Sequence, residues 1–278
     1  MPNSKIEISD EELNSLTNAI KNRYDLDFTN YESKSLKRGF ARLIMKKQLG
    51  NVLGLWAKIL RDREFFLGCI DDLTVNLTEL FRNPEIWTKL KEDILLEYEN
   101  KLNINMWHAG CSSGEEVYTT AIILKELDML KKTKTLATDL SSSILAEAIG
   151  GKYPKVLINK YAASFSKYLS TGKIEDCFVI DDHSMVIKDD LRKHIDFKQH
   201  NLAQDSMDKK FDVIFCRNVM IYFDDKLKEK VLNLFYNCLN DDGYFIIGYY
   251  DMLPESSKKF FKVYDSKTRI YKKVLNNG

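Results

Sequence analysis

The stretch that most constrains the fold of this chain reads MWHAGCSSGEE over residues 106–116. Apolar residues up to Ala109 predict a strand, and the small residues of 110–114 predict a loop. An apolar helix is expected to follow over 117–130. Small residues in such a loop let a ligand touch the backbone, and the N–H groups at the start of the helix point at its polar groups. The unit therefore predicts the opening of a doubly wound α/β fold that binds a nucleotide-like ligand.

Further strands follow in the order that such a fold needs. Residues 135–139 predict a short strand that ends in Asp139, whose carboxylate could bind both hydroxyls of an adenosine ribose, cap the next helix, or do both. Residues 195–200 resume the sheet, and 211–217 form the most hydrophobic strand, which is expected at its centre. Because ligands of these folds bind at the carboxyl ends of the strands, Arg217 and Asn218 are candidate site residues.

Two segments predict antiparallel β-structure. Apolar runs at 177–180 and 185–187 flank a polar turn and predict a hairpin, which we assign to a small β-subdomain inserted at about 155–193. Runs at 260–264 and 269–274 predict a closing hairpin. Other expected elements are a helix closing at Gly150–Gly151, a helix over 225–239, a turn at 241–243 and a strand over 244–248.

The N-terminal quarter of the chain is predicted to be helical. Ser9 and Glu12 have the spacing of a capping box, which predicts a helix to about Tyr24. Further helices are expected over 33–49 and 51–70, so we assign residues 1–72 to a helical domain.

Residues 73–100 are assigned to a linker and a helix. Asn83 is expected to cap this helix, Pro84 to occupy its first position, and the helix to run to about Asn100.

The helix over 33–49 carries basic residues and no acidic one. An apolar stripe is expected along one side of it, formed by Leu36, Phe40, Leu43 and Ile44. Five of its six basic residues fall on the other side, namely Lys34, Lys37, Arg38, Arg42 and Lys46. The sixth, Lys47, is expected near the stripe. Like charges one turn apart repel each other, so the face is either a solvated surface or a contact for an anionic partner.

Composition excludes several classes of protein. The net charge of +1 and the pI of about 7.6 argue against a general nucleic-acid binder. No apolar run approaches the ~20 residues of a membrane span, and residues 1–5 lack the apolar segment of a signal peptide, so we expect a cytoplasmic protein. The five cysteines contain no C-x-x-C pair, which indicates reduced, buried thiols. The four histidines show no metal-ligand spacing, so we expect no metal site.

Several motifs together resemble one family, the chemotaxis receptor protein-glutamate O-methyltransferases. The motifs, which stand in the order of that family, are residues 76–82 (NLTELFR), 107–118 (WHAGCSSGEEVY), 137–139 (ATD), 151–153 (GKY), 201–202 (NL) and 215–223 (FCRNVMIYF). The resemblance spans essentially the whole chain. One departure is the segment Gly248-Tyr249-Tyr250-Asp251, where the family usually has glycine, histidine, serine and glutamate.

The resemblance implies a Rossmann-like methyltransferase domain over residues 101–278 that uses S-adenosylmethionine and releases S-adenosylhomocysteine. It implies transfer of the methyl group to glutamate carboxylates of the cytoplasmic domain of chemotaxis receptors, with no nucleic acid and no membrane insertion. The implied cofactor residues are Asn76, Thr78, Arg82, Gly110, Glu116 (or, second, Glu115), Asp139, Asn201, Leu202, Arg217 and Asn218. Tyr222 and Arg82 are the catalytic candidates. Arg38, Arg42 and Lys46 would bind the anionic receptor.

The sequence supports other functions less well. A dinucleotide-dependent oxidoreductase lacks support because the loop has no G-x-G-x-x-G. A nucleic-acid methyltransferase would explain the basic helix but not the near-neutral charge. A module that binds the cofactor or the receptor without turnover stays open, as does a methyltransferase for another protein or a small-molecule carboxylate. For Arg217 and Tyr222, a salt bridge and plain core packing are the structural alternatives.

Overall fold

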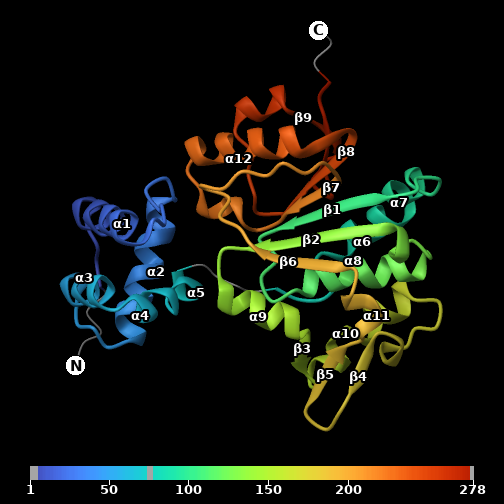
Figure 1. Ribbon diagram of the computed structural model, residues 1–278, viewed down its shortest axis with the longest axis horizontal. Helices are drawn as coiled ribbons and strands as arrows, with labels where there is room; N and C mark the ends of the chain where they lie inside the picture. The colour runs from blue at the N-terminus through green and yellow to red at the C-terminus, as the bar shows by residue number, and fades with distance from the viewer. Residues whose placement is uncertain (1–5, 74–77, 276–278) are drawn as a thin grey trace.

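A computed structural model describes residues 6–73 and 78–275 of the chain. Figure 1 shows a central β-sheet with helices on both faces, a lobe of N-terminal helices in blue beside it, and a small second sheet at one end. No helix within the described ranges is long and apolar enough to cross a membrane. All five cysteines are buried free thiols, as predicted.

The N-terminal helices are α1 (Asp10–Tyr24), α2 (Ser33–Lys46), α3 (Val52–Arg61), α4 (Arg63–Leu67) and α5 (Ile70–Leu73). The predicted capping box is confirmed, because Ser9 Oγ accepts from Glu12 N at 3.1 Å and Glu12 Oε2 accepts from Ser9 N at 2.8 Å. The single helix expected over 51–70 is wrong. Asp62 breaks it by accepting from Phe65 N at 2.9 Å, which starts α4 as a separate helix.

The apolar stripe of α2 faces the core of this lobe, as predicted. Its four members are buried, and they pack in one cluster with apolar side chains of the other N-terminal helices. α2 also packs closely on α5, since a Cβ at Gly39 would lie 2.9 Å from the carbonyl oxygen of Leu73.

The helix predicted over 84–100 has an interruption. It consists of α6 (Pro84–Lys89), the π-helical turn η1 (Leu90–Ile94) and α7 (Leu95–Glu97). Pro84 occupies the first helical position, as predicted.

Within the described residues, the large sheet has seven strands in the order β6-β2-β1-β7-β8-β10-β9. The strands are β1 (Ile104–Ala109), β2 (Thr133–Asp139), β6 (Ile195–Gln199), β7 (Phe211–Cys216), β8 (Leu239–Ile247), β9 (Phe261–Asp265) and β10 (Ile270–Lys273). The first five are parallel, while β10 runs antiparallel to β8 and to β9. The doubly wound fold, the central position of β7 and the closing hairpin are therefore confirmed.

One predicted turn is wrong. Residues 241–243 lie inside β8, where the pairing with β7 shifts between Phe211 and Val213. The polar pair Asp241 and Asp242 is accommodated by this irregularity of the ladder.

Alternate residues of the central strands face two cores. Trp107 and Ile214 pack in the cluster that contains the buried side of α12 (Asp225–Cys238), whereas Met106 and Val213 pack in the cluster of α8 (Glu115–Glu126). Figure 1 shows α12 on one face of the sheet and α8 on the other. Burial on both faces explains why β7 is apolar at every position except that of Asp212, which is buried as well.

The small sheet has the order β3-β5-β4, with β3 (Lys152–Pro154), β4 (Phe178–Ile180) and β5 (Ser184–Ile187). The predicted hairpin is confirmed as the antiparallel pair β4–β5, whereas β3 was not predicted. Helices of this region are α9 (Ser142–Gly150), which ends at Gly151 as predicted, α10 (Leu157–Tyr168), which was not predicted, and α11 (Asp189–Arg192). Short 3₁₀ turns complete the chain: η2 (Leu130–Lys132), η3 (Ile174–Asp176), η4 (Met220–Tyr222) and η5 (Glu255–Lys259).

Candidate active site

A cavity of about 570 Å³ lies at the carboxyl ends of the parallel strands, against the N-terminal helices. The predicted residues that line it are Arg38, Arg42, Thr78, Arg82, Gly110, Glu116, Asp139, Asn201, Leu202, Arg217, Asn218 and Tyr222. Lys46 is not among the lining residues and instead pairs with Asp72, Nζ to Oδ1, at 2.5 Å. The predicted residue Asn76 lies outside the described residues.

The loop after β1 is shaped by the backbone of β2. Gly110 N and Cys111 N both donate to the carbonyl oxygen of Thr138, at 2.8 and 2.9 Å. Gly110 has a φ of +86°, and a Cβ there would lie 2.3 Å from Cγ2 of Val219. Glycine is therefore required at this position for conformational and steric reasons.

Asp139 holds this loop at the end of β2. Its Oδ2 accepts from Ser112 N at 2.8 Å, and its Oδ1 accepts from Ser141 N at 3.2 Å. The alternative role of Asp139 as the cap of the next helix is wrong, because Ser141 is the N-cap of α9 and accepts from Ile144 N. The carboxylate of Asp139 also lines the cavity, where it is placed to accept from ligand hydroxyls.

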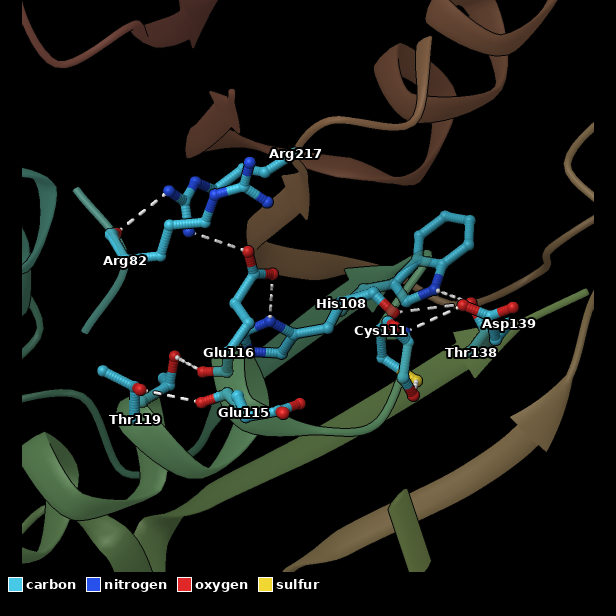
Figure 2. Close-up of polar contacts among 12 residues, drawn as sticks. Arg82, His108, Cys111, Glu115, Glu116, Thr119, Thr138, Asp139 and Arg217 are labelled. Carbon is cyan, nitrogen blue, oxygen red and sulfur yellow. Dashed lines mark hydrogen bonds and ion pairs between the residues drawn. The ribbon is translucent and has the colours of Figure 1, made fainter. Parts of the chain in front are cut away.

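A buried charge network forms the opposite wall (Figure 2). Glu116 accepts from Arg217 Nη1 at 2.9 Å and from His108 Nδ1 at 2.8 Å. Burial alone would raise the pKa of Glu116, but the hydrogen bond from His108 and the charge of Arg217 outweigh it and lower that pKa. Glu116 is therefore an anion held in place at the first turn of α8, where the helix dipole also favours negative charge.

Glu115, the second choice for this position, is not among the cavity residues. It is buried and accepts from Ser113 Oγ at 2.8 Å. Burial raises the pKa of Glu115.

Arg217 connects this network to the linker. Its Nη2 donates to the carbonyl oxygen of Arg82 at 3.1 Å and to Oδ1 of Asn83 at 2.8 Å, and its guanidinium lies 5.4 Å from the ring centre of Trp87. The prediction that Asn83 caps α6 is therefore wrong. Asn83 has a φ of +58° and its side chain makes no capping hydrogen bond, because it binds Arg217.

The N-terminal lobe is attached at the mouth of the cavity. Asp224 N donates to Asn30 O at 2.9 Å, Glu32 N donates to Tyr222 O at 2.8 Å, and the rings of Tyr31 and Phe223 meet edge to face. The N-cap residue of α2, Glu32, is thus bonded to the backbone of Tyr222.

Three lining residues have buried polar atoms without a hydrogen-bond partner in the described part of the chain. Ser112 Oγ, His200 Nδ1 and Arg217 Nε have no hydrogen-bond partner within the described residues, and all three residues line the cavity. Buried polar atoms are normally paired, so a polar ligand is expected to satisfy some of them. The cavity combines two acceptor carboxylates, Asp139 and Glu116, with the guanidinium of Arg82 and a glycine-lined loop. This set of groups fits a ligand that carries a ribose, an ammonium and a carboxylate.

Several lining residues were not predicted. Ser112 lies inside the predicted motif 107–118, while Ser141 and His200 lie within two residues of the motifs 137–139 and 201–202. Tyr31 comes from the N-terminal lobe, and nothing local in the sequence indicates its position. No group of three or more potential metal ligands occurs among the described residues.

Two family models match this chain. Residues 76–270 match the model described as "CheR methyltransferase, SAM binding domain", and residues 11–74 match "CheR methyltransferase, all-alpha domain". The Rossmann-like sheet and this match define an S-adenosylmethionine-dependent methyltransferase.

Related proteins align with this chain over most of their own length. The chemotaxis protein methyltransferase of Borreliella burgdorferi is 34% identical over 264 residues, covering 89% of this chain and 90% of the relative. The chemotaxis protein methyltransferase of Vibrio parahaemolyticus is 30% identical over 276 residues, covering 96% and 98%. "Putative methyltransferase Cher3" of Pseudomonas putida is 30% identical over 240 residues, covering 86% and 88%. The chain belongs to the CheR methyltransferase family.

Proposed function

We propose that this protein transfers the methyl group of S-adenosylmethionine to glutamate side chains of chemotaxis receptors, at their cytoplasmic domains, and forms glutamate methyl esters. One observation carries the proposal beyond family membership. Arg38 and Arg42 of α2 line the same cavity as Asp139 and Glu116, so an anion-attracting surface and the cofactor residues share one site.

The chain's residues have separable tasks in binding the cofactor. Asp139 accepts from the ribose, Arg82 and Thr78 bind the carboxylate, and Glu116 attracts the ammonium. Asn201 and Leu202 flank the adenine, while Arg217 and Asn218 close the wall. When bound, the cofactor supplies an electrophilic methyl group on a sulfonium.

The acceptor needs no general base. A glutamate carboxylate has an ordinary pKa near 4.3 and is ionised at neutral pH. The rate then depends on alignment of the carboxylate oxygen with the methyl group and on exclusion of water. Tyr222 is our candidate for lining this transfer position.

The basic face of α2 is partly neutralised by acids from elsewhere in the chain. Lys37 pairs with Asp10 at 2.8 Å, and Lys46 pairs with Asp72. Arg38 and Arg42 are exposed and line the cavity, so we assign the steering of the anionic receptor to these two residues rather than to Lys46.

The experiment is transfer of labelled methyl groups from S-adenosylmethionine to membranes that contain chemotaxis receptors, followed by base treatment. Base-labile incorporation by the wild type is the expected result. Donor binding without any incorporation would identify a regulatory module, and base-stable label would identify a different acceptor group.

The charge reversal Arg38→Glu/Arg42→Glu tests the acceptor side. It should lower kcat/KM for receptors at least ~10-fold at low salt, and less at high salt, without changing donor affinity. Lys131→Glu/Lys134→Glu is the charge-matched control. These exposed lysines lie just before and at the start of β2, at the amino ends of the strands, whereas the cavity lies at their carboxyl ends. Equal loss of donor binding and receptor methylation would refute the assignment of α2.

A further inference from the structure

Asp251 is a buried aspartate that the proposed mechanism does not use. It follows β8 and closes a turn in which Asp251 N donates to Gly248 O at 3.1 Å. Its relative exposure is 0%, although Tyr250 beside it is 76% exposed. A carboxylate is rarely buried to this extent unless its oxygens are satisfied.

The oxygens of Asp251 are satisfied by two different loops. Oδ2 accepts from Gly248 N at 2.9 Å and from Asn218 N at 2.6 Å, while Oδ1 accepts from Ile221 N at 3.0 Å. Gly248 follows β8, and Asn218 and Ile221 follow β7. One carboxylate therefore joins the carboxyl ends of two neighbouring strands.

The segment it holds is tightly packed. Asn218 has a φ of +60°, in the left-handed region that few residues other than glycine and asparagine adopt readily. A Cβ at Gly248 would lie 2.7 Å from Asn218 N and 2.8 Å from Oδ2 of Asp251. The close approach of these three residues thus depends on a glycine at 248.

Both loops that Asp251 joins line the cavity. Asn218, Ile221 and Tyr222 come from the loop after β7, and Tyr250 comes from the turn after β8. Asp251 binds the N–H of Ile221, the residue that precedes Tyr222. The carbonyl oxygen of Tyr222 in turn accepts from the N–H of Glu32, at the start of α2.

We propose that Asp251 is a positioning residue for methyl transfer, which sets Ile221 and Tyr222 at the acceptor side of the cavity by accepting N–H groups from both ends of the 218–221 segment. This inference rests on the proposed function for its kinetic consequence only. The geometry that it describes can be tested without an acceptor.

The variant Asp251→Asn separates the two ends of the segment. An amide has a single acceptor oxygen, and the Oδ2 position receives two N–H groups, so the amide oxygen should take that position. The amide NH₂ group then faces Ile221 N–H, and two donors oppose each other. The Asn218 end should stay in place while the Ile221–Tyr222 end is released.

Hydrogen exchange measured on the full chain is the first test. Exchange of the backbone amides of 219–223 should become at least ~10-fold faster in Asp251→Asn, while 139–141 should not change. The exposed change Asp208→Asn is the matched control. Unchanged exchange at 219–223 overturns the inference, whether or not the protein methylates receptors.

The second test is a split between turnover and binding. For Asp251→Asn at pH 7.5, the receptor methylation rate at saturating donor should fall at least ~10-fold, donor Kd should change less than ~3-fold, and the Tm should not fall. Gly248→Ala, which pushes on Asn218 itself, should lower both rate and donor affinity. An unchanged rate in Asp251→Asn, or a parallel loss of rate, donor affinity and Tm, overturns the positioning role. Faster exchange in a protein whose wild type does not label receptors would refute the proposed function alone.

Discussion

Replacement of Arg217 by methionine tests whether the buried charge network holds the cavity together. The Arg217 side chain is 2% exposed and binds Glu116, Asn83 and the carbonyl oxygen of Arg82. Methionine fills a similar volume but supplies neither charge nor donors. The carboxylate of Glu116 would remain buried with His108 as its partner.

The expected cost follows from this geometry. Removal of one partner of a buried ion pair costs about 3–5 kcal/mol, because the remaining charge stays desolvated. For a domain of this size, 1 kcal/mol lowers the Tm by about 2–4 °C, so Arg217→Met should lower it by about 6–20 °C. The pKa of Glu116 should rise, since the charge that lowers it is gone.

A double-mutant cycle with Glu116→Gln measures the coupling. The loss of unfolding free energy in Arg217→Met/Glu116→Gln should be at least ~1 kcal/mol smaller than the sum of the losses in the two single variants. The reason is that the double variant leaves no unpaired buried charge at either position. Lys258→Met is the surface control, since its pair with Glu255 is 75% and 83% exposed and should shift the Tm by less than ~1 °C.

The pH dependence gives a further check with a defined sign. The pKa of Glu116 is lowered in the folded protein, so its stabilising contribution is present above the ordinary pKa of about 4.3 and is lost as the pH falls through the lowered value. The stability gap between wild type and Arg217→Met should therefore narrow in acid. A Tm for Arg217→Met within ~1 °C of wild type, or strictly additive variants, would refute the reasoning.

Two further predictions concern single carboxylates. Asp139→Asn should weaken S-adenosylmethionine binding at least ~10-fold in calorimetry, because one charge-assisted acceptor for the ribose is lost and the loop N–H of Ser112 loses its partner, while the exposed control Asp128→Asn should bind normally. Burial raises the pKa of Asp251 to about 6 despite its N–H donors and Arg217. The methylation rate should therefore fall as the pH drops through about 6, and Asp251→Asn should lack this inflection; an identical profile in both proteins would contradict the role of Asp251. Because this pKa is raised, the contribution of Asp251 to stability is fully present below its unfolded pKa and is lost as the pH rises through about 6, so Asp251→Asn should gain in Tm relative to wild type over that range.

The fold could be predicted because its signals are local. Each of three signals is contained within a few residues: the small-residue loop after β1, the acidic end of β2 and the largely apolar sequence of β7. Parallel α/β sheets allow few topologies, so the order of these elements was enough to place the cavity at the strand ends.

Local patterns failed where a distant residue competes for the same group. Asn83 has the sequence of a helix cap, but Arg217, 134 positions away, takes its side-chain oxygen. The charged partner outcompetes the weaker local capping interaction. Lys46 is exposed and pairs with Asp72, and its part in receptor binding stays a prediction.

The sequence by itself determined the order of the strands, the methyl-donor loop and the family of this protein, because periodicity and loop chemistry act between neighbours in the chain. Only the tertiary structure decided which charges are paired and which backbone groups are held. Glu116 and Arg217 are 101 residues apart, and Asp251 binds Asn218 across 33. Such contacts depend on sheet register and on burial, which raises the energy of an unpaired polar group and so selects one set of partners.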